Sequence, residues 1–249
     1  MLNTWLFSLS AVILISLVSL IGVLTLLIKR QKLTELLTFL VSFAVGGLFG
    51  DALIHLIPEA FREIKPQTLV PFLILAGILM FFVLEKFIRW RHCHFPAESH
   101  HPHPVVTMNL IGDGAHNLID GMIIGASFLV SPQIGVATTL AVLLHEIPQE
   151  IGDFGILIHG GLSVRRALAW NFISALFAVL GAIISLIVGP LASNYSLYVL
   201  PITAGGFIYM AGSDLIPSLH DRCEATESGL QFVSILLGIG VMAGLLLVG

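Results

Sequence analysis

Long apolar segments, separated by short polar stretches, follow one another along the whole chain. A helix needs about 20 apolar residues to cross the hydrocarbon core of a bilayer. Because lipid offers the backbone no hydrogen-bond partners, apolar segments of this length are expected to be helical. The pattern predicts eight membrane-spanning helices, at residues 5–28, 34–58, 68–90, 105–130, 133–159, 166–189, 196–219 and 229–248.

The composition of the chain is that of a membrane protein. Of the 249 residues, 57% are hydrophobic and only 10% are charged, whereas a soluble domain has about 25% charged residues. We therefore expect an all-α polytopic membrane protein in which residues 1–249 form a single transmembrane domain. The two cysteines, Cys93 and Cys223, are too few for a disulfide framework. The first basic residues, Lys29 and Arg30, follow the first apolar run, an order that argues against a cleaved signal peptide.

The basic residues divide unevenly between the two sets of predicted loops. The even-numbered loops contain only Arg62 and Lys65. Since lysine and arginine are enriched in cytoplasmic loops, we expect the odd-numbered loops in the cytoplasm and both termini outside. The basic residues in the odd-numbered loops or at the span ends beside them are Lys29, Arg30, Lys32, Lys86, Arg89, Arg91, Arg165, Arg166 and Arg222.

A weak internal repeat links the second and seventh predicted spans. A Gly-Gly pair at 46–47 is followed by Leu-Ile-Pro at 56–58, and both motifs recur with the same spacing at 205–206 and 215–217. The two spans run in opposite directions, so this is the pattern of an inverted repeat, which is common in secondary transporters. Chance similarity in a sequence rich in glycine and leucine is the alternative.

Ionisable side chains lie inside four of the predicted spans, and no lysine or arginine accompanies them there. A charge at the bilayer centre costs about 3 kcal/mol, so the carboxylates of the fourth and fifth spans would together cost on the order of 15 kcal/mol if ionised and unpaired. Protons, water in a cavity or bound cations must balance them, and histidines at helical spacing favour metal cations. The ionisable residues away from the ends of these spans that carry the argument are Asp51, His55, Asp113, His116, Asp120, His145, Glu146, Glu150, Asp153, His159 and Asp214.

The fourth and fifth spans carry the densest pattern of such residues. His116 and Asp120 are four residues apart, so they share one helix face. Pro148 lacks a backbone donor and is expected to bend the fifth span. Facing each other, the two spans would offer imidazole, amide and carboxylate ligands, which suit zinc and also manganese or ferrous iron. The predicted metal site consists of His116, Asn117, Asp120, His145, Glu146, Gln149 and Glu150.

Several other residues allow both a structural and a functional interpretation. His159 and His220 are more simply explained as hydrogen-bonded packing residues than as ligands. Asp153 could bond to the backbone near its helix end, and Asp113 could be solvated at the inner end of its span. The G-x-x-x-G pattern at 121–125 favours close static packing of helices, and the alternative is a smooth surface on which a transport unit slides.

The loop at residues 91–104, predicted to lie in the cytoplasm between the third and fourth spans, is rich in histidine. His-rich tracts often bind metal ions, so we expect this loop to sequester or sense metal. A solvated loop without such a function is the alternative. Its histidines are His92, His94, His100, His101 and His103.

Two motifs resemble signatures of the ZIP (Zrt/Irt-like) family of metal transporters. The sequence HNLIDG at 116–121 resembles the fourth-span signature of that family, and HEIPQEIGDF at 145–154 resembles its fifth-span signature. The second motif is closest to the subfamily with the pattern His-Glu-x-Pro-His-Glu-x-Gly-Asp. The resemblance extends over the whole chain, through eight spans, outside termini and a His-bearing third loop.

This resemblance implies a transporter that moves Zn²⁺, or alternatively Mn²⁺, Fe²⁺ or Cd²⁺, into the cytosol without an organic cofactor. It implies a metal site, often binuclear, between the fourth and fifth spans, and by analogy an elevator-like movement. The positions that match the ligands of that site are His116, Asn117, Asp120, His145 and Glu146. Along the pathway, Asp51, His55, Asn171 and Asp214 match family positions, and we add the intramembrane acids Asp113 and Asp153.

Two positions depart from the family pattern. Gln149 replaces a histidine of the subfamily motif, which weakens the expectation of a second metal position and of a strict preference for zinc. Ser218 follows Pro217 where some members have glutamate, so an acidic ligand on the exit side is absent from that position.

Two other functions are compatible with these residues. An intramembrane metalloprotease would need the motif H-E-x-x-H, but Gln149 occupies the last position and Pro148 distorts the turn that would align the pair. A proton-coupled carrier of another solute would explain the carboxylates but not their grouping with imidazole and amide ligands.

The expected partners are divalent metal ions and the lipid bilayer, and no feature suggests nucleic acid. A homodimer is compatible with the sequence, which does not predict the oligomeric state. We expect a multi-pass protein of the plasma (inner) membrane in a bacterium, or of an organelle or the plasma membrane in a eukaryote.

Overall fold

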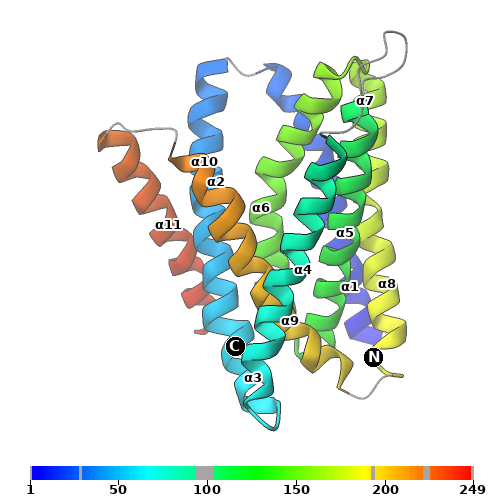
Figure 1. Cartoon of the computed structure of the whole chain (residues 1–249), viewed down its shortest axis with the longest axis vertical. Helices are drawn as coiled ribbons and strands as arrows, with labels where there is room; N and C mark the ends of the chain where they lie inside the picture. The colour runs from blue at the N-terminus through cyan, green and yellow to red at the C-terminus, as the bar shows by residue number, and fades with distance from the viewer. Residues whose placement is uncertain (1, 28–29, 93–103, 192–193, 221–224, 248–249) are drawn as a thin grey trace.

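The structure is a computed structural model of the chain that describes residues 2–27, 30–92, 104–191, 194–220 and 225–247. Within these ranges the backbone is helical apart from short turns and contains no strand. The elements form one elongated bundle (Figure 1). In chain order they are α1 (Leu2–Val18), η1 (Ser19–Leu27), α2 (Arg30–Gly50), η2 (Asp51–Leu56), α3 (Ile57–Glu63), α4 (Leu69–His92), α5 (Pro104–Val130), α6 (Pro132–His159), α7 (Val164–Ala175), α8 (Phe177–Val188), α9 (Tyr195–Tyr209), η3 (Met210–Leu215), α10 (Ile216–Leu219) and α11 (Ala225–Leu245).

Consecutive elements join end to end into rods that coincide with the predicted spans to within a few residues. The second rod continues to Glu63, beyond the predicted end at residue 58, because Pro58 lies in the first turn of α3, where its missing N–H is tolerated. α5 and α6 are long enough to cross a membrane, but they carry histidines and carboxylates within their length. Among the described helices, those long and apolar enough by themselves to cross a membrane are Leu2–Leu27, Glu35–Glu63, Leu69–Lys86, Val164–Val188 and Thr226–Leu245.

The two ends of the bundle differ in their basic residues and in the position of the chain termini. At one end α6 ends and α7 begins with Arg165 and Arg166, and we call this the basic end. It is the upper end in Figure 1, whereas α1 begins and α11 ends in the lower half. The chain therefore starts and finishes away from the basic end, as the predicted topology requires. That the basic end faces the cytoplasm stays a prediction.

The predicted repeat has a counterpart in the backbone. η2 and η3 are π-helical segments of the same length, and each ends immediately before the Ile-Pro pair of the repeated motif. The N–H groups of Ile57 and Ile216 donate to carbonyl oxygens five residues earlier, at Ala52 and Ala211. A proline inside a helix disturbs the regular hydrogen bonding of the preceding turn, and a π-helical turn accommodates that disturbance. Both rods thus contain the same local irregularity at the same place in the motif.

The glycines of the repeat mark two equivalent helix crossings. A Cβ on Gly46 in α2 would lie 2.1 Å from the carbonyl oxygen of Ile235 in α11, and one on Gly205 in α9 would lie 2.0 Å from that of Ile74 in α4. Such distances require glycine, because the two backbones are in direct contact. The same crossing is built twice, by rods that run in opposite directions in Figure 1, as an inverted repeat requires.

The G-x-x-x-G pattern of the fourth span is a packing surface. A Cβ on Gly121 would lie 1.9 Å from the carbonyl oxygen of Ala178 in α8, and one on Gly125 would lie 2.8 Å from the Cβ of Ser185. α5 is therefore in close backbone contact with α8 along this face. The contact supports the interpretation as close packing and leaves the opposite face of α5 for α6.

Candidate metal centre

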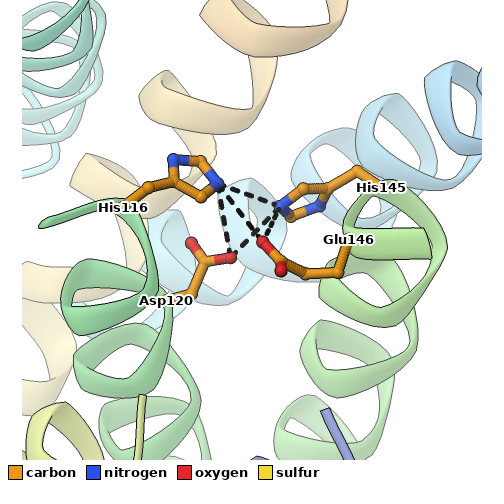
Figure 2. A group of neighbouring side chains, drawn as sticks. All are labelled: His116, Asp120, His145 and Glu146. Atoms are coloured by element: carbon orange, nitrogen blue, oxygen red, sulfur yellow. Dashed lines mark hydrogen bonds and ion pairs between the residues drawn. The ribbon is translucent and has the colours of Figure 1, made fainter. Parts of the chain in front are cut away.

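Four side chains from two neighbouring helices converge in the interior of the bundle. His116 and Asp120 come from α5, and His145 and Glu146 come from α6 (Figure 2). One ligand atom from each residue lies within 4.8 Å of those of the other three. We call these four residues the histidine cluster.

The distances from each histidine nitrogen to the other ligand atoms of the histidine cluster are similar. The Nε2 atoms of His116 and His145 lie 3.4 Å apart. Asp120 Oδ2 lies 3.1 Å from His145 Nε2 and 3.6 Å from His116 Nε2. Glu146 Oε1 lies 3.5 Å from His116 Nε2 and 3.7 Å from His145 Nε2. The atoms thus surround a common point rather than forming separate pairs.

The histidine cluster is buried and short of hydrogen-bond donors. Asp120, His145 and Glu146 are essentially inaccessible, and the side chain of His116 is 13% exposed. One carboxylate oxygen of Asp120 and both of Glu146 accept no hydrogen bond. In the described part of the chain, these two carboxylates form ion pairs with histidines alone. Buried carboxylates normally need a positive partner, and the described residues provide no lysine or arginine for this role.

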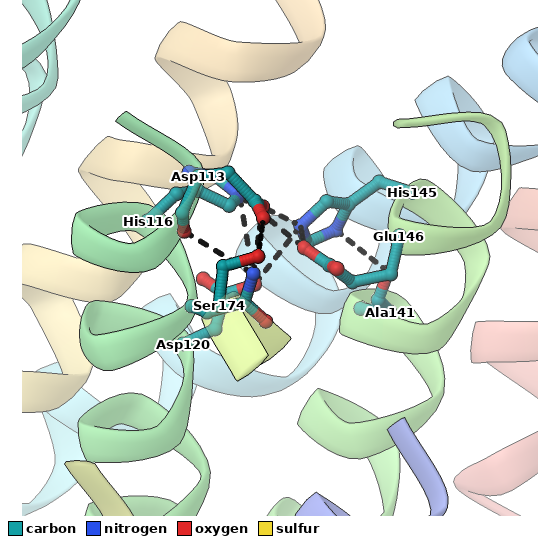
Figure 3. Close-up of polar contacts among 8 residues, drawn as sticks. Asp113, His116, Asp120, Ala141, His145, Glu146 and Ser174 are labelled. Carbon is teal, nitrogen blue, oxygen red and sulfur yellow. Dashed lines mark hydrogen bonds and ion pairs between the residues drawn. The ribbon is translucent and has the colours of Figure 1, made fainter. Parts of the chain in front are cut away.

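The backbone of α6 determines how His145 presents its ring. The Nδ1 atom of His145 lies 3.1 Å from the carbonyl oxygen of Ala141, one turn earlier (Figure 3). Because a carbonyl oxygen can only accept, Nδ1 carries the hydrogen and donates it. In the neutral ring, Nε2 then has a lone pair directed at the cluster, which is the tautomer that binds a metal ion.

A second group of carboxylates lies beside the first. Asp113 from α5 and Glu150 and Asp153 from α6 place one oxygen each within 4.8 Å of one another, and we call them the carboxylate cluster. Asp113 precedes His116 by one turn on α5, and Glu150 follows Glu146 by one turn on α6. α5 starts and α6 ends at the basic end, so the carboxylate cluster lies nearer to that end than the histidine cluster.

A cavity of about 380 Å³ is lined by residues of both clusters. Its lining includes His116 and His145 of the histidine cluster and Asp113 and Asp153 of the carboxylate cluster. It also includes Glu85, near the end of α4. On α5 the lining residues run from Asn109 to His116, and on α6 they run from His145 to Asp153. Because α5 starts and α6 ends at the basic end, the cavity lies on the basic side of the histidine cluster.

The structure divides the predicted metal site between these features. Asn117 is fully buried, and its Nδ2 donates to Asp113 Oδ1 at 2.7 Å, so this amide contacts the carboxylate cluster. Glu150 belongs to the carboxylate cluster and Gln149 lines the cavity. Of the seven residues of the predicted site, four form the histidine cluster. Two others, Asn117 and Glu150, contact or belong to the carboxylate cluster, and Gln149 lines the cavity.

The predicted pathway residues lie in several places. Asn171 of α7 donates from Nδ2 to Glu150 Oε2 at 2.5 Å. Asp51 is fully buried in η2 and belongs to neither cluster. His55 Nε2 lies 2.9 Å from the carbonyl oxygen of Met242, beside a cavity of about 850 Å³ at the end opposite the basic end. The side chains that lie outside the described residues are those of Asp214, His159, His92, His94, His100, His101 and His103.

Three residues of this region were not predicted. Ser174 of α7 donates its hydroxyl to Asp113 (Figure 3). Tyr209 of α9 donates its hydroxyl to Glu85 Oε2 at 2.5 Å across the cavity. The signal for Ser174 was its position three residues after Asn171, on the same helix face. The only sequence signal for Glu85 was its acidic side chain near the end of the third span, where the other charged residues are basic.

These features define a class of protein. A bundle of apolar helices encloses a buried set of imidazole and carboxylate ligands, and a cavity lies beside this set. Intramembrane ionisable residues that face a cavity mark the pathways of ions and substrates. The fold and the site together describe a membrane transport protein for cations.

Comparison with known proteins identifies the family. The family profile described as ZIP Zinc transporter matches residues 2–106 and 100–246. The zinc transporter zipt-7.1 of Caenorhabditis briggsae is 33% identical over 97% of this chain and 79% of its own length. The zinc transporter YKE4 of Saccharomyces cerevisiae is 32% identical over 86% of this chain and 72% of its own length. The zinc transporter ZIP13 of Homo sapiens is 32% identical over 82% of this chain and 69% of its own length.

The chain belongs to the ZIP zinc transporter family. It is a multi-pass integral membrane protein that transports divalent metal ions, and it is not an enzyme. The family assignment excludes the metalloprotease and the carrier of another solute, and it confirms the resemblance carried by the two helix motifs.

Proposed function

We propose that the histidine cluster is the position at which this transporter binds its substrate and that the substrate is Zn²⁺. One observation carries the proposal. Zinc takes tetrahedral nitrogen and oxygen ligands at about 2.0–2.2 Å, which places neighbouring ligand atoms about 3.3–3.6 Å apart. The five distances that involve a histidine nitrogen in the cluster run from 3.1 to 3.7 Å.

The chemistry of the ligands supports a cation at this point. The lone pair of His145 Nε2 faces a carboxylate oxygen of Asp120 at 3.1 Å. An acceptor that faces an acceptor at this distance is unfavourable unless a proton or a metal ion lies between them. A zinc ion would bind both groups at once and would balance the charge of Asp120 and Glu146.

The names of the relatives favour zinc as the substrate. The donor set alone does not exclude Mn²⁺, Fe²⁺ or Cd²⁺, because imidazole and carboxylate ligands accept all of them. Gln149 can offer only a neutral amide oxygen from the cavity wall, so we assign one strong position to the histidine cluster.

The cavities support a direction of transport. The cavity at the basic end includes His116 and His145 in its lining, and the cavity at the opposite end shares no lining residue with it. If the basic end is cytoplasmic, as the positive-inside rule predicts, this conformation is open to the cytosol. We propose that zinc leaves the histidine cluster through this cavity and enters the cytosol.

The remaining predicted residues are assigned to the pathway. His55 lines the cavity at the opposite end, where zinc would arrive. Asp113 and Asp153 belong to the carboxylate cluster and Asn171 contacts it, on the basic side of the histidine cluster, and we assign all three to the route of release. We assign Asp51 and Asp214 to the pathway because they match pathway positions of the family. We assign the histidines of the 91–104 loop to sequestering or sensing the metal.

The test is zinc uptake into proteoliposomes that contain a trapped fluorescent zinc indicator. His116→Ala and Glu146→Ala should each slow uptake by more than about tenfold, since each removes a ligand of the site. His220→Ala is the matched control, because this histidine is exposed at the end of α10 and lines neither cavity. Uptake by both cluster variants at the wild-type rate would show that zinc does not pass through the histidine cluster.

A further inference from the structure

The cavity at the end opposite the basic end, which we call the distal cavity, is built by three rods of the bundle. Its volume is about 850 Å³. The second rod contributes lining residues within 54–62, the start of α6 contributes residues within 131–136, and the end of α11 contributes residues 245–246. Figure 1 shows α6 and α11 on either side of the second rod, and both helices contact α2. The distal cavity therefore lies between α6 and α11, against the second rod.

The walls of the distal cavity change from mostly apolar to charged toward the ends of the helices. Val136 of α6 lies in the inner part. His55 lies there too, and its Nε2 is 2.9 Å from the carbonyl oxygen of Met242, so this ring nitrogen has a partner within the protein. Glu59 and Arg62 lie on α3, closer to the end of the rod. The distal cavity is therefore amphipathic, with a charged rim.

Two apolar side chains at the sides of the distal cavity reach the surface of the bundle. Val136 of α6 is 50% exposed, and Leu246 after α11 is 58% exposed. Exposed apolar surface beside a cavity marks a place where another apolar molecule binds. In a multi-pass membrane protein the apolar molecules at this surface are lipids. The distal cavity is therefore accessible to acyl chains of the bilayer.

The dimensions of the distal cavity suit an acyl chain. Its volume of about 850 Å³ falls within the range of about 300–1,000 Å³ found for cavities that bury an organic ligand. Along the second rod, the eight-residue step from Ile54 to Arg62 corresponds to about 12 Å at the rise of a helix. Half of the hydrocarbon core of a bilayer is about 15 Å thick. The cavity thus extends along most of the depth that a chain of one leaflet occupies.

The charges at the rim select the head group. Arg62 forms an ion pair with Glu59, and its Nε lies 3.6 Å from Glu63 Oε1. One guanidinium faces two carboxylates, so these three side chains together carry one negative charge. Arginine is well suited to hold a phosphate, and the Arg62 side chain is 69% exposed. The carboxylates favour a head group that also carries a positive charge, and they disfavour a head group whose net charge is negative.

We propose that the distal cavity binds one zwitterionic phospholipid with a primary ammonium, of the phosphatidylethanolamine class. An acyl chain lies against Val136, Arg62 contacts the phosphate, and Glu59 accepts hydrogen bonds from the ammonium. This site does not depend on where zinc binds. One consequence rests on the proposed function: because His55 lines the same cavity, the lipid must leave before zinc can enter from that side.

The first test needs no variant. The full-length protein is equilibrated with equal amounts of phosphatidylethanolamine, phosphatidylcholine and phosphatidylglycerol, and the lipids that stay bound are counted by native mass spectrometry. One phosphatidylethanolamine should be retained, in preference to each of the others by more than about threefold, as expected for a partly exposed ion pair. No retained lipid, equal retention of the three classes, or a preference for phosphatidylglycerol would overturn the proposal.

The second test fills the apolar part of the distal cavity. Val136→Trp adds a large side chain at a half-exposed position and should remove most of the retained lipid. Val233→Trp is the matched control, because Val233 on α11 is 51% exposed and lines neither cavity. Thermal unfolding shows that both variants are folded. Equal retention of lipid by the two variants would show that the lipid binds elsewhere.

The third test separates the two charges of the head group. Glu59→Gln should remove the preference for phosphatidylethanolamine over phosphatidylcholine, whereas Arg62→Gln should weaken the retention of both lipids, since both carry the phosphate. Glu63→Gln is the matched control, because Glu63 contacts the same arginine but does not line the distal cavity. A preference for phosphatidylethanolamine that Glu59→Gln leaves unchanged, or that Glu63→Gln removes equally, would overturn the assignment of the ammonium to Glu59.

Discussion

His116 Nε2 and His145 Nε2 lie 3.4 Å apart, although they belong to different helices and are 29 residues apart in the chain. This separation is close to the edge of a zinc tetrahedron, which is about 3.3 Å long between two nitrogen ligands. One of the two rings is oriented by a carbonyl oxygen of its own helix, at Ala141. The two imidazoles are therefore positioned to bind one metal ion together.

This relationship predicts the coordination of bound zinc. X-ray absorption of the protein with one equivalent of Zn²⁺ should show two imidazole nitrogens and two oxygens at about 2.0–2.2 Å. His145→Ala should reduce the imidazole contribution to one, and His220→Ala should leave it unchanged. A spectrum with oxygen ligands alone would contradict the assignment of zinc to the histidine cluster.

Gln149→His should tighten zinc binding. Gln149 lines the same cavity as His116 and His145 and follows His145 by four residues on α6, so a histidine there places a third imidazole on the same helix face. We expect affinity to rise by about tenfold, equivalent to about 1.4 kcal/mol, and zinc release to slow. Calorimetry checks the affinity, with Gln149→Asn as the control that keeps an amide. Equal zinc affinity in the wild type and in Gln149→His would contradict the explanation.

Zinc binding should weaken in acid. Two imidazoles must be neutral and two carboxylates ionised before they can bind the metal, so protons compete with zinc for the same atoms. Affinity should rise with pH between about pH 5 and pH 8, by up to tenfold per pH unit for each proton displaced. Calorimetry in buffers of different ionisation enthalpy measures how many protons are released. An affinity independent of pH over this range would be inconsistent with a site built from His116, Asp120, His145 and Glu146.

Gly46→Ala should destabilise the protein, whereas Gly240→Ala should not. A Cβ on Gly46 meets the carbonyl oxygen of Ile235 at 2.1 Å, and a Cβ on Gly240 meets no atom within 4 Å. The first change forces α2 and α11 apart at a cost of about 1–3 kcal/mol, while the second replaces glycine by a better helix former. Thermal unfolding in detergent compares the two, and equal unfolding temperatures would show that the crossing is not tightly packed.

Much of the fold was predictable because its signals are local. Apolar runs of spanning length predict helices whatever lies beside them, and the described rods coincide with those runs. The pairing of His116 with Asp120 on one face follows from helical spacing alone. The absence of lysine and arginine from the same spans indicated a bound cation, and the family assignment agrees with it.

The division of the site into two clusters was not predictable from the sequence. Glu146 and Glu150 share a helix face, yet Glu146 lies with the histidines and Glu150 lies with Asp113. One turn of helix moves a side chain by about 5.4 Å along the axis, which is enough to separate two ion-sized sites. The spacing along one helix does not say which turn of the neighbouring helix lies opposite.

The class of this protein, the course of its helices and the ligands available on each helix face all follow from the amino-acid sequence. These properties depend on residues close to one another in the chain. The contacts of Ser174 and Asn171 of α7 with the carboxylate cluster, and the cavity on the basic side of the histidine cluster, emerged from the three-dimensional packing. The physical reason is that the rotation and register of packed helices result from contacts between distant segments, such as Gly121 against Ala178.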